Sequence, residues 1–386
     1  MLALMTISAR YVCSRCGTGS SVSSATWCCP SCRGPWDLDF TAAPVPLARL
    51  AGRAGSLWRY EEALPLADPS CSLGEGRTPL VRLTDTVSAK LDFLMPTLSF
   101  KDRGAVMLAE LARRLEPRRV IADSSGNAGT AVAAYCARAG LDCTVYVPEG
   151  TAPGKLEQIS AHGARLTRVP GGREATARAA RAAAGEPGTF YASHVFNPYF
   201  LHGTKTYVYE LWEDLGGRLP DTLVVPVGNG TLLLGAALAT AELYAHGLVP
   251  ARPALVAVQA RAVAPLAEAF HAGADELLAP ASSPAPAPSS TPAPVRSTLA
   301  EGIAIPNPPR AAQILRAVRE SGGTFLTVTE DEIRTAQLDL AARGLFVEPT
   351  GVACWAAITA APRPGTAVVP LCGAGAKTGL ARSRAT

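Results

Sequence analysis

The sequence predicts an α/β protein built on two open, mostly parallel sheets. From about residue 70 onward, short apolar runs that are typical of buried strands alternate with alanine-rich amphipathic segments that are typical of helices. Elements that alternate at this spacing form parallel sheets with helices on both faces. The chain has 386 residues, which is enough for two or three domains with full cores.

A first group of elements lies between residues 105 and 194. Each expected strand in this group is followed by Gly, Ser or Asn at the start of the next helix, as in successive strand-to-helix units. The expected helices are 105–115, 127–140, 155–164 and 173–185, and the expected strands lie within 118–125, 142–150, 164–172 and 189–194.

A second group of elements follows after residue 220. Strands are expected within 222–230, 254–260 and 366–375, with helices after the first two. Residues 279–297 are a Pro/Ala/Ser low-complexity segment that lacks the apolar surface to fold alone. We expect a mobile surface insertion there, and we favour an inert loop extension over a segment that borders the active site.

The N-terminal segment contains two cysteine pairs with the spacing of a zinc ribbon. Cys13 and Cys16 form one C-x2-C pair, and Cys29 and Cys32 form the second. Each pair forms a tight knuckle that presents two thiolates, and four thiolates close a tetrahedral shell. The sequence therefore predicts a structural zinc ion, with Cys28 either a bystander or a replacement ligand.

The overall composition excludes several classes of function. Charged residues make up 18% of the chain and the net charge is +4, which is too weak and too scattered for a nucleic-acid-binding surface. The sequence has no run of about 18 apolar residues, so we expect no membrane span. The first eight residues do not form a signal-peptide core, and we therefore expect a cytoplasmic protein.

Three loops carry residue types that suit a small-molecule site. Lys101 comes just before a predicted helix, and it is one of only five lysines that could supply a reactive amine. Ser124, Ser125 and Asn127 lie at a strand-to-helix turn, where backbone N–H groups suit a carboxylate. Residues 227–231 form a similar turn that can hold a phosphate monoester. Each loop alone is also compatible with an ordinary tight connection.

Six short motifs occur in a fixed order along the chain: LGEGRTPL (73–80), PTLSFKDRG (96–104), SSGNAG (124–129), PVGNGT (226–231), EPTG (348–351) and LCGAGAK (371–377). Their order resembles that of the pyridoxal-phosphate (PLP) enzymes related to tryptophan synthase β, the fold-type II group. Within this group the chain is most similar to threonine synthases, because that branch combines a cysteine-rich N-terminal ribbon with GEGxTPL and SFKDR.

The resemblance implies a role for each residue of the site. Lys101 would bind the cofactor covalently and later move the α-proton, and Asn127 would hydrogen-bond the ring oxygen of the cofactor. Ser124 and Ser125 would hold the substrate carboxylate. Cys372 would face the pyridine nitrogen as a neutral thiol, which cannot keep that nitrogen protonated. The cofactor phosphate would be held by Val227, Gly228, Asn229, Gly230 and Thr231.

Several positions depart from the pattern of the family. Met95 stands where the family usually has Asn, and Leu98 stands where it usually has Gly. His202 and Thr204 replace a Glu and a Gln that many threonine synthases have. These changes leave the cofactor chemistry intact, but they affect the pocket beside the amino acid and therefore the choice of substrate. For His202 we favour a surface position at a helix start over a role in proton transfer.

We therefore expect a PLP-dependent lyase of amino-acid biosynthesis, similar to threonine synthase, which acts on O-phosphohomoserine or a related small amino acid. The alternatives are β-elimination, as in serine or threonine dehydratases or diaminopropionate ammonia-lyase, and β-replacement in specialised metabolism. A binding protein without catalysis is disfavoured because the lysine and both loops occur together. The expected organisation is a ribbon of residues 1–40 and a catalytic unit of 41–386 with an inserted domain at about 97–210. The cofactor is expected in the cleft between the domains, and the resemblance implies a homodimer.

Overall fold

The computed structural model describes residues 9–277 and 298–381, so the low-complexity segment 279–297 lies outside the described residues. The chain divides into two compact units, each assembled from separate stretches of sequence. The first unit comprises Met1–Pro79, Asp92–Arg218 and Leu238–Pro250, and the second comprises Leu80–Leu91, Leu219–Ala237 and Ala251–Thr386. The domain boundaries expected from the sequence stay a prediction.

The N-terminal part of the first unit is a small antiparallel sheet. Its strands are β1 (Arg10–Cys13), β2 (Gly19–Ser21) and β3 (Trp36–Asp39), in the order β2-β1-β3. The rings of Tyr11 and Trp36 stack with their centroids 5.4 Å apart. Both side chains are buried, so aromatic packing supports a sheet that is too small to form a core by itself.

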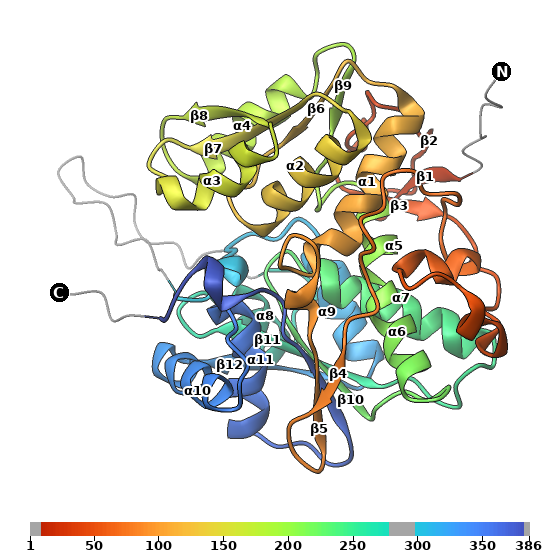
Figure 1. Ribbon diagram of the computed structural model, residues 1–386, viewed down its shortest axis with the longest axis vertical. Coiled ribbons are helices and arrows are strands. Elements are labelled where there is room, and N and C mark those ends of the chain that lie inside the picture. Colours follow the sequence, from red (N-terminus) through yellow and green to blue (C-terminus); the bar gives the residue numbers. More distant parts are fainter. Residues whose placement is uncertain (1–8, 278–297, 382–386) are drawn as a thin grey trace. The chain divides into compact units, whose positions relative to one another are not determined.

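The first unit also contains a four-stranded parallel sheet (Figure 1). The strand order is β8-β7-β6-β9. Helices cover both faces of this sheet. Neighbouring residues of a strand point to opposite faces: Val120 belongs to the apolar cluster that includes α2 and α3, and Ile121 belongs to the cluster that includes α4. The elements are β6 (Arg119–Ala122), α2 (Asn127–Ala139), β7 (Cys143–Pro148), α3 (Pro153–Ala161), β8 (Arg165–Val169), α4 (Arg173–Ala183) and β9 (Thr189–Tyr191).

Three further helices of the first unit lie before and after the four-stranded sheet in the sequence. Helix α1 (Lys101–Leu115) contacts both α2 and α5 (Tyr199–Thr204), and α6 (Thr206–Asp214) follows α5 directly. A Cβ atom at Gly104 would lie 2.4 Å from the ring of Phe200, so glycine is required where α1 meets α5. The short 3-10 helices are η1 (Leu47–Gly52), η2 (Leu57–Ala63) and η3 (Asp92–Leu94).

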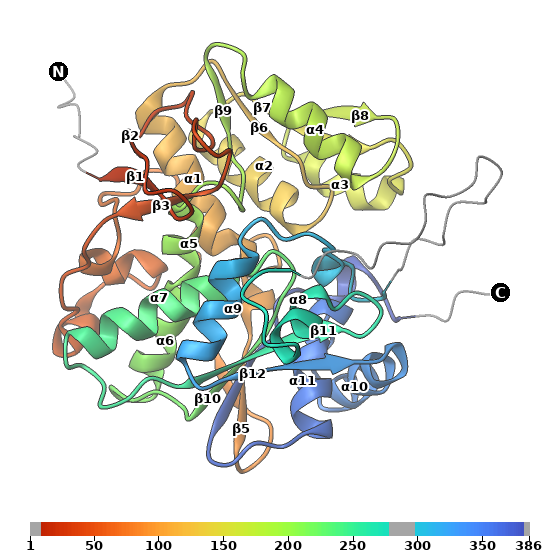
Figure 2. The same ribbon diagram turned by 180° about the vertical axis from the view of Figure 1, so that it is seen from behind.

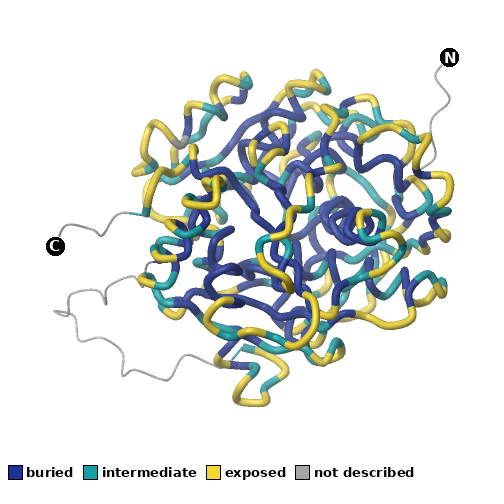
Figure 3. The backbone as a smooth tube through the Cα atoms, turned by 60° about the horizontal axis from the view of Figure 1, so that its bottom comes forward, coloured by how far each residue is buried: buried dark blue, intermediate teal, exposed yellow. Residues whose placement is uncertain are grey.

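The second unit is built on a six-stranded sheet in the order β12-β11-β10-β13-β5-β4. All neighbouring strands are parallel except β4, which pairs antiparallel with β5 at the edge. Residues of β10, β11 and β13 are buried almost throughout. Figure 3 shows the backbone coloured by burial, with long buried stretches flanked by exposed ones. The strands are β4 (Leu80–Arg82), β5 (Val87–Lys90), β10 (Thr222–Pro226), β11 (Ala254–Ala260), β12 (Thr324–Val328) and β13 (Ala367–Pro370).

Helices cover the six-stranded sheet on both sides. Helix α11 contacts β10 to β13 and lies in front of the sheet in Figure 1. Helix α9 contacts β11 and β12 and lies in front of the sheet in Figure 2, which is the view from behind. Thr329 and Glu332 form a capping box at the start of α10. The helices are α8 (Pro265–His271), α9 (Ala311–Glu320), α10 (Glu330–Ala342) and α11 (Pro349–Ala360), with 3-10 turns η4 (Glu301–Ile303) and η5 (Gly375–Lys377). Helix α7 (Thr231–Ala245) begins in this unit, and its residues from Leu238 onward belong to the first unit.

The predicted fold class is confirmed, since both larger sheets are mostly parallel and the small cysteine-rich sheet precedes them. The main difference concerns the helix expected at 105–115. It begins four residues earlier, so that Lys101 is its first residue and not part of the preceding loop. Of the helices in the described ranges, none has both the length and the apolar character needed to cross a membrane.

Candidate active site

Lys101 occupies the first turn of α1, beside two aromatic rings. Its Nζ atom lies 4.6 Å from the ring centroid of Phe100 and 5.6 Å from that of Phe200. The side chain is half-buried, and Phe100 and Phe200 are buried. The amine therefore lies at a helix N-terminus between an apolar lead-in and α5, a position from which a lysine can act as a nucleophile or base.

Met95 and Leu98, the two departures from the family pattern near Lys101, lie in the loop before this lysine. Leu98 has φ 62°, in the left-handed region, and 37% of its surface is exposed. Glycine adopts this region freely, whereas leucine does so at a cost of about 1 kcal/mol. Met95 is buried, and its Sδ atom accepts a hydrogen bond from the N–H of Gly76 at 3.2 Å. A methionine sulfur therefore supports the loop of the GEGRTPL motif.

The expected strand-to-helix turn lies between β6 and α2. Ser124 is buried and its Oγ accepts a hydrogen bond from the N–H of Gly126 at 3.3 Å, whereas Ser125 is half-buried. Asn127 is the first residue of α2, the helix that packs against α1. A Cβ atom at Gly129 would lie 1.7 Å from the carbonyl oxygen of Ser124, so the last glycine of SSGNAG is required by this close approach.

The structure also identifies His194, which the sequence analysis missed. Its ring centroid lies 5.8 Å from that of Phe200, the ring that Lys101 also approaches. Burial lowers the pKa of His194 well below its usual range, and the positive charges of Lys101 and Arg173 lower it further. The ring is therefore neutral at pH 7. The signal in the sequence was its position at the end of the expected strand segment 189–194, three residues after β9 ends at Tyr191.

His202 does not lie on the surface, and that expectation is wrong. The residue belongs to α5, is 4% exposed, and packs edge-on against Phe40 at 5.4 Å between ring centroids. Burial, together with the charge of Lys205, lowers its pKa well below the usual range. Lys205 itself pairs with Glu242 at 2.6 Å. His202 is thus a neutral core histidine next to a partly buried ion pair.

In the second unit, residues 227–231 connect β10 to α7. The N–H of Val227 donates to the carbonyl of Val258 at 2.8 Å, which extends the sheet into the loop. Gly230 has φ 74°, and a Cβ atom there would lie 2.3 Å from Ile314 Cδ1. Asn229 is half-buried, and Thr231 is buried at the start of α7. The loop therefore precedes the N-terminus of a helix of 15 residues, an arrangement that binds phosphate groups.

Cys372 follows β13, the strand next to β10. The side chain is fully buried, and its Sγ atom lies 3.8 Å from the carbonyl oxygen of Pro370, to which the thiol donates. A Cβ atom at Gly351 would lie 2.8 Å from the backbone nitrogen of Cys372. The EPTG and LCGAGAK motifs are thus in contact, and the N–H of Glu348 donates to the carbonyl of Gly373 at 2.9 Å.

A loop around Gly302 completes this end of the second unit. A Cβ atom at Gly228 would lie 2.8 Å from the carbonyl oxygen of Gly302, and the N–H of Gly302 donates to Thr350 Oγ1 at 3.1 Å. The phosphate-type loop and the motifs after β13 therefore share one edge of the sheet. The carboxyl ends of parallel strands are where α/β proteins bind their ligands. Backbone approaches this close fit a phosphate held by main-chain amides.

The four predicted metal ligands also come together. The Sγ atoms of Cys13, Cys16, Cys29 and Cys32 all lie within 4.8 Å of one another. Hydrogen bonds from the hydroxyl and the backbone of Thr18 lower the pKa of Cys16 to about 6, which favours a thiolate. Cys28 is instead buried against Val195 and Phe196, outside this group. The cluster could hold a tetrahedral metal ion, and its four sulfur atoms suit zinc.

The two halves of the cysteine cluster have the same backbone design. The N–H of Gly17 donates to the carbonyl of Cys13, and the N–H of Arg33 donates to the carbonyl of Cys29, both at 2.9 Å. Gly17 and Arg33 are also both in the left-handed region, with φ 71° and 58°. Such paired turns aim the thiols of each C-x2-C pair at one point.

Comparisons with known proteins identify the family of the chain. The family model described as pyridoxal-phosphate dependent enzyme matches residues 71–373. The chain is 32% identical to threonine synthase of Methanosarcina acetivorans, over 88% of this chain and 84% of that protein, and 33% identical to threonine synthase of Methanocaldococcus jannaschii, over 87% and 84%.

Solved structures lead to the same family. A threonine deaminase from T.th. superimposes with a TM-score of 0.64 and 29% identity, over 78% of this chain and 92% of that chain. Maize serine racemase, at 19% identity and a TM-score of 0.63 over 78% and 88% of the two chains, shares the fold. The motifs, the fold and these similarities lead to one conclusion, that the chain belongs to the family of pyridoxal-phosphate-dependent enzymes.

Proposed function

We propose that this enzyme catalyses a threonine-synthase-like reaction, in which O-phosphohomoserine or a related amino acid loses phosphate and gains water. The observation that carries the proposal is the similarity to threonine synthases over most of both chains. The cysteine ribbon before the catalytic motifs supports it. Such an enzyme is a carbon–oxygen lyase acting on phosphates, and we expect it to work as a cytoplasmic homodimer.

Each site residue has a distinct task in this proposal. PLP, when bound, withdraws electrons from the α-carbon of the attached amino acid and stabilises negative charge there. Lys101 Nζ removes the α-proton and returns a proton later, and the rings of Phe100 and Phe200 beside it position the amine for this step. Ser124 and Ser125 orient the substrate carboxylate through the amides of their turn.

The remaining residues hold the cofactor. We propose that Asn127 donates to the ring oxygen and that the amides of residues 227–231 bind the phosphate. The buried thiol of Cys372, which donates to the Pro370 carbonyl, would face the ring nitrogen and, as a neutral group, would bring no charge to it. A neutral partner would leave the ring nitrogen unprotonated and the ring a weaker electron sink, which suits elimination and replacement at the β and γ carbons.

The lysine assignment can be tested by spectroscopy. The purified enzyme is expected to show the visible absorption band of lysine-bound PLP, and borohydride reduction should attach the cofactor to the peptide that contains Lys101. Lys101→Arg keeps the positive charge but should abolish both signals, because a guanidinium does not condense with the cofactor. Lys377→Arg is the matched control and should retain both. Persistence of the band in Lys101→Arg would overturn the assignment.

A second candidate is β-elimination, which the similarity to threonine deaminase favours. Leu98 and His202 also differ from the threonine synthase pattern in and near the loops of the site. Assays with O-phosphohomoserine, threonine, serine and O-phosphoserine separate the two functions. The synthase proposal requires release of phosphate with formation of threonine, whereas release of a keto acid without threonine supports the deaminase type.

A further inference from the structure

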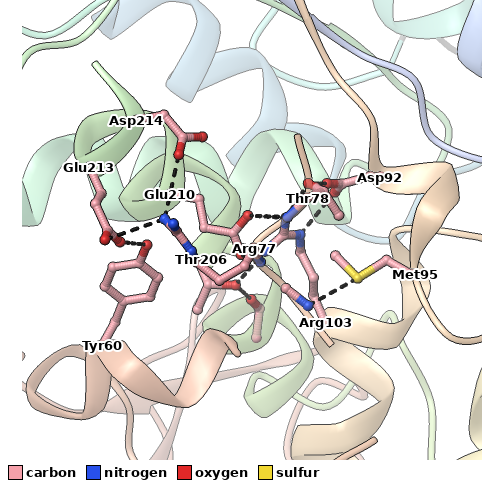
Figure 4. Close-up of polar contacts among 12 residues, drawn as sticks. Tyr60, Arg77, Thr78, Asp92, Met95, Arg103, Thr206, Glu210, Glu213 and Asp214 are labelled. Carbon is pink, nitrogen blue, oxygen red and sulfur yellow. Dashed lines mark hydrogen bonds and ion pairs between the residues drawn. The ribbon is translucent and has the colours of Figure 1, made fainter. Parts of the chain in front are cut away.

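We propose that Arg103 is a positioning residue that fixes the first turn of α1, and thereby the place of Lys101. This inference rests on the proposed role of Lys101 as the cofactor-binding lysine. Arg103 lies two residues after Lys101 in the same helical turn, but its side chain is fully buried and does not join the catalytic groups. It reaches instead into a network that includes the otherwise unexplained GEGRTPL motif (Figure 4).

The guanidinium of Arg103 is bonded on every side. Its Nε and Nη2 atoms donate to the two carboxylate oxygens of Asp92 at 2.9 and 2.8 Å. Its Nη1 and Nη2 atoms donate to the two oxygens of Glu210 at 2.6 and 2.9 Å. Nη1 also donates to Thr206 Oγ1 at 3.1 Å. These bonds use all five N–H groups, so the orientation of the side chain is fully determined.

The partners of Arg103 belong to segments that are distant in sequence. Glu210 Oε1 also accepts the N–H of Arg77 at 2.8 Å, and Glu210 Oε2 accepts that of Thr78 at 3.3 Å. The hydroxyl of Thr78 donates to Asp92 Oδ1 at 2.7 Å. Arg103 thus connects the GEGRTPL loop, the turn at Asp92, the start of α1 and helix α6.

The electrostatics of the network make Arg103 hard to replace. The side chains of Arg103, Asp92 and Glu210 have no exposed surface, so one cation faces two carboxylates away from water. Removing the cation would leave both carboxylates buried without compensation, which is strongly destabilising. A lysine would keep the charge, but a single ammonium cannot make bidentate bonds to two carboxylates at once.

A second constraint acts where α1 meets α5. A Cβ atom at Gly203 would lie 1.9 Å from the carbonyl oxygen of Arg103, and Gly104 lies directly against Phe200. Phe200 is also one of the two rings that Lys101 Nζ approaches. With Arg103 held by its side chain and its neighbour held by α5, the first turn cannot rotate without moving Nζ relative to this ring. A misplacement of about 1 Å in such a site costs about 100-fold in rate.

The test compares Arg103→Lys with Glu110→Gln in the full-length holoenzyme. Glu110 is a fitting control because it is buried on the same helix, accepts bonds from Arg113 and Arg114, and lies two turns away from Lys101. Both variants are expected to lower thermal stability. Only Arg103→Lys should lower kcat about 100-fold with little change in KM, and shift the pH midpoint of the visible cofactor band.

Hydrogen exchange supplies a readout that does not depend on turnover. In Arg103→Lys the amides of residues 101–105 should exchange about tenfold faster than in Glu110→Gln. If Arg103→Lys does not fold, Thr206→Val removes one bond to the guanidinium and should show the same changes in weaker form. The positioning role would be overturned if Arg103→Lys and Glu110→Gln had equal kcat values and equal amide exchange rates over residues 101–105.

The two proposals can fail separately in this experiment. If the wild-type protein carries no cofactor on Lys101, the proposed function fails, while the exchange of residues 101–105 still reports on the order of the turn. If the wild-type protein carries the cofactor but Arg103→Lys behaves like Glu110→Gln, only the positioning role fails.

Discussion

Leu98 shows how a single residue can conflict with its backbone conformation. Its φ of 62° suits glycine, and 37% of its surface is exposed, so burial of the leucine offsets only part of the local cost. Relief of the left-handed strain by glycine is worth about 1 kcal/mol, and the extra freedom of glycine in the unfolded chain costs about the same. We therefore expect Leu98→Gly to leave the free energy of unfolding nearly unchanged.

Leu98→Val should lower the free energy of unfolding by more than about 1 kcal/mol, because a β-branched residue is a true outlier in this region. Urea unfolding of the three proteins measures both effects. Equal stability of the Leu and Val forms would contradict the conformation of this loop. Because Leu98 precedes Lys101 by only three residues, the same variants also report whether the loop influences substrate choice.

At the scale of elements, the cysteine knuckles are expected to act as a metal-dependent unit. We predict one zinc ion per chain by elemental analysis, and loss of that ion in Cys16→Ser, since three thiolates no longer close the shell. Cys28→Ala is the matched control because Cys28 packs against Phe196 and not in the cluster. Full zinc in Cys16→Ser, or its loss in Cys28→Ala, would contradict this ligand set.

The two glycines at the ends of α7 provide a matched pair for the phosphate loop. Gly230 has φ 74° with Ile314 Cδ1 2.3 Å from a Cβ position, whereas Gly247 has φ 67° with nothing within 4 Å. Alanine at either position carries the same backbone cost of about 1 kcal/mol. Only Gly230→Ala should also displace the loop and weaken PLP binding, by at least about tenfold. Equal cofactor affinity in both variants, measured by fluorescence titration, would argue against a role for this loop.

At the scale of the whole molecule, buried histidines are expected to set the response to mild acid. His194 and His202 have pKa values well below the unfolded value of about 6.5. The unfolded chain therefore takes up these protons first, and the free energy of unfolding falls as pH drops below about 6.5. The pKa of Glu110 is lowered in the folded protein, so protonation of this carboxyl group reduces the free energy of unfolding further, but only at more acidic pH.

The contribution of one histidine can be isolated by substitution. His202→Phe retains an aromatic ring against Phe40 but binds no proton. Between pH 7 and 5 its free energy of unfolding should fall less steeply than that of the wild type, by up to about 1.4 kcal/mol per pH unit. Denaturant unfolding at several pH values measures the difference. Parallel curves for the two proteins would mean that His202 is already protonated or exposed in the folded state.

The sequence by itself determined the α/β class, the strand-to-helix loops and the family, because hydrophobic period and local motifs are properties of neighbouring residues. The four cysteines were predictable for the same reason, since two fixed spacings define the knuckles. The family pattern also singled out Leu98 as unusual, although its positive φ became visible only in the folded loop.

The tertiary structure decided which residues surround these motifs. Arg103 reads in the sequence as an ordinary helix residue, but its partners Asp92 and Glu210 lie 11 and 107 positions away. His194 and His202 were likewise assigned by burial and neighbouring charge, which depend on contacts between distant segments. Such contacts follow from how helices and strands pack, and no local pattern encodes them.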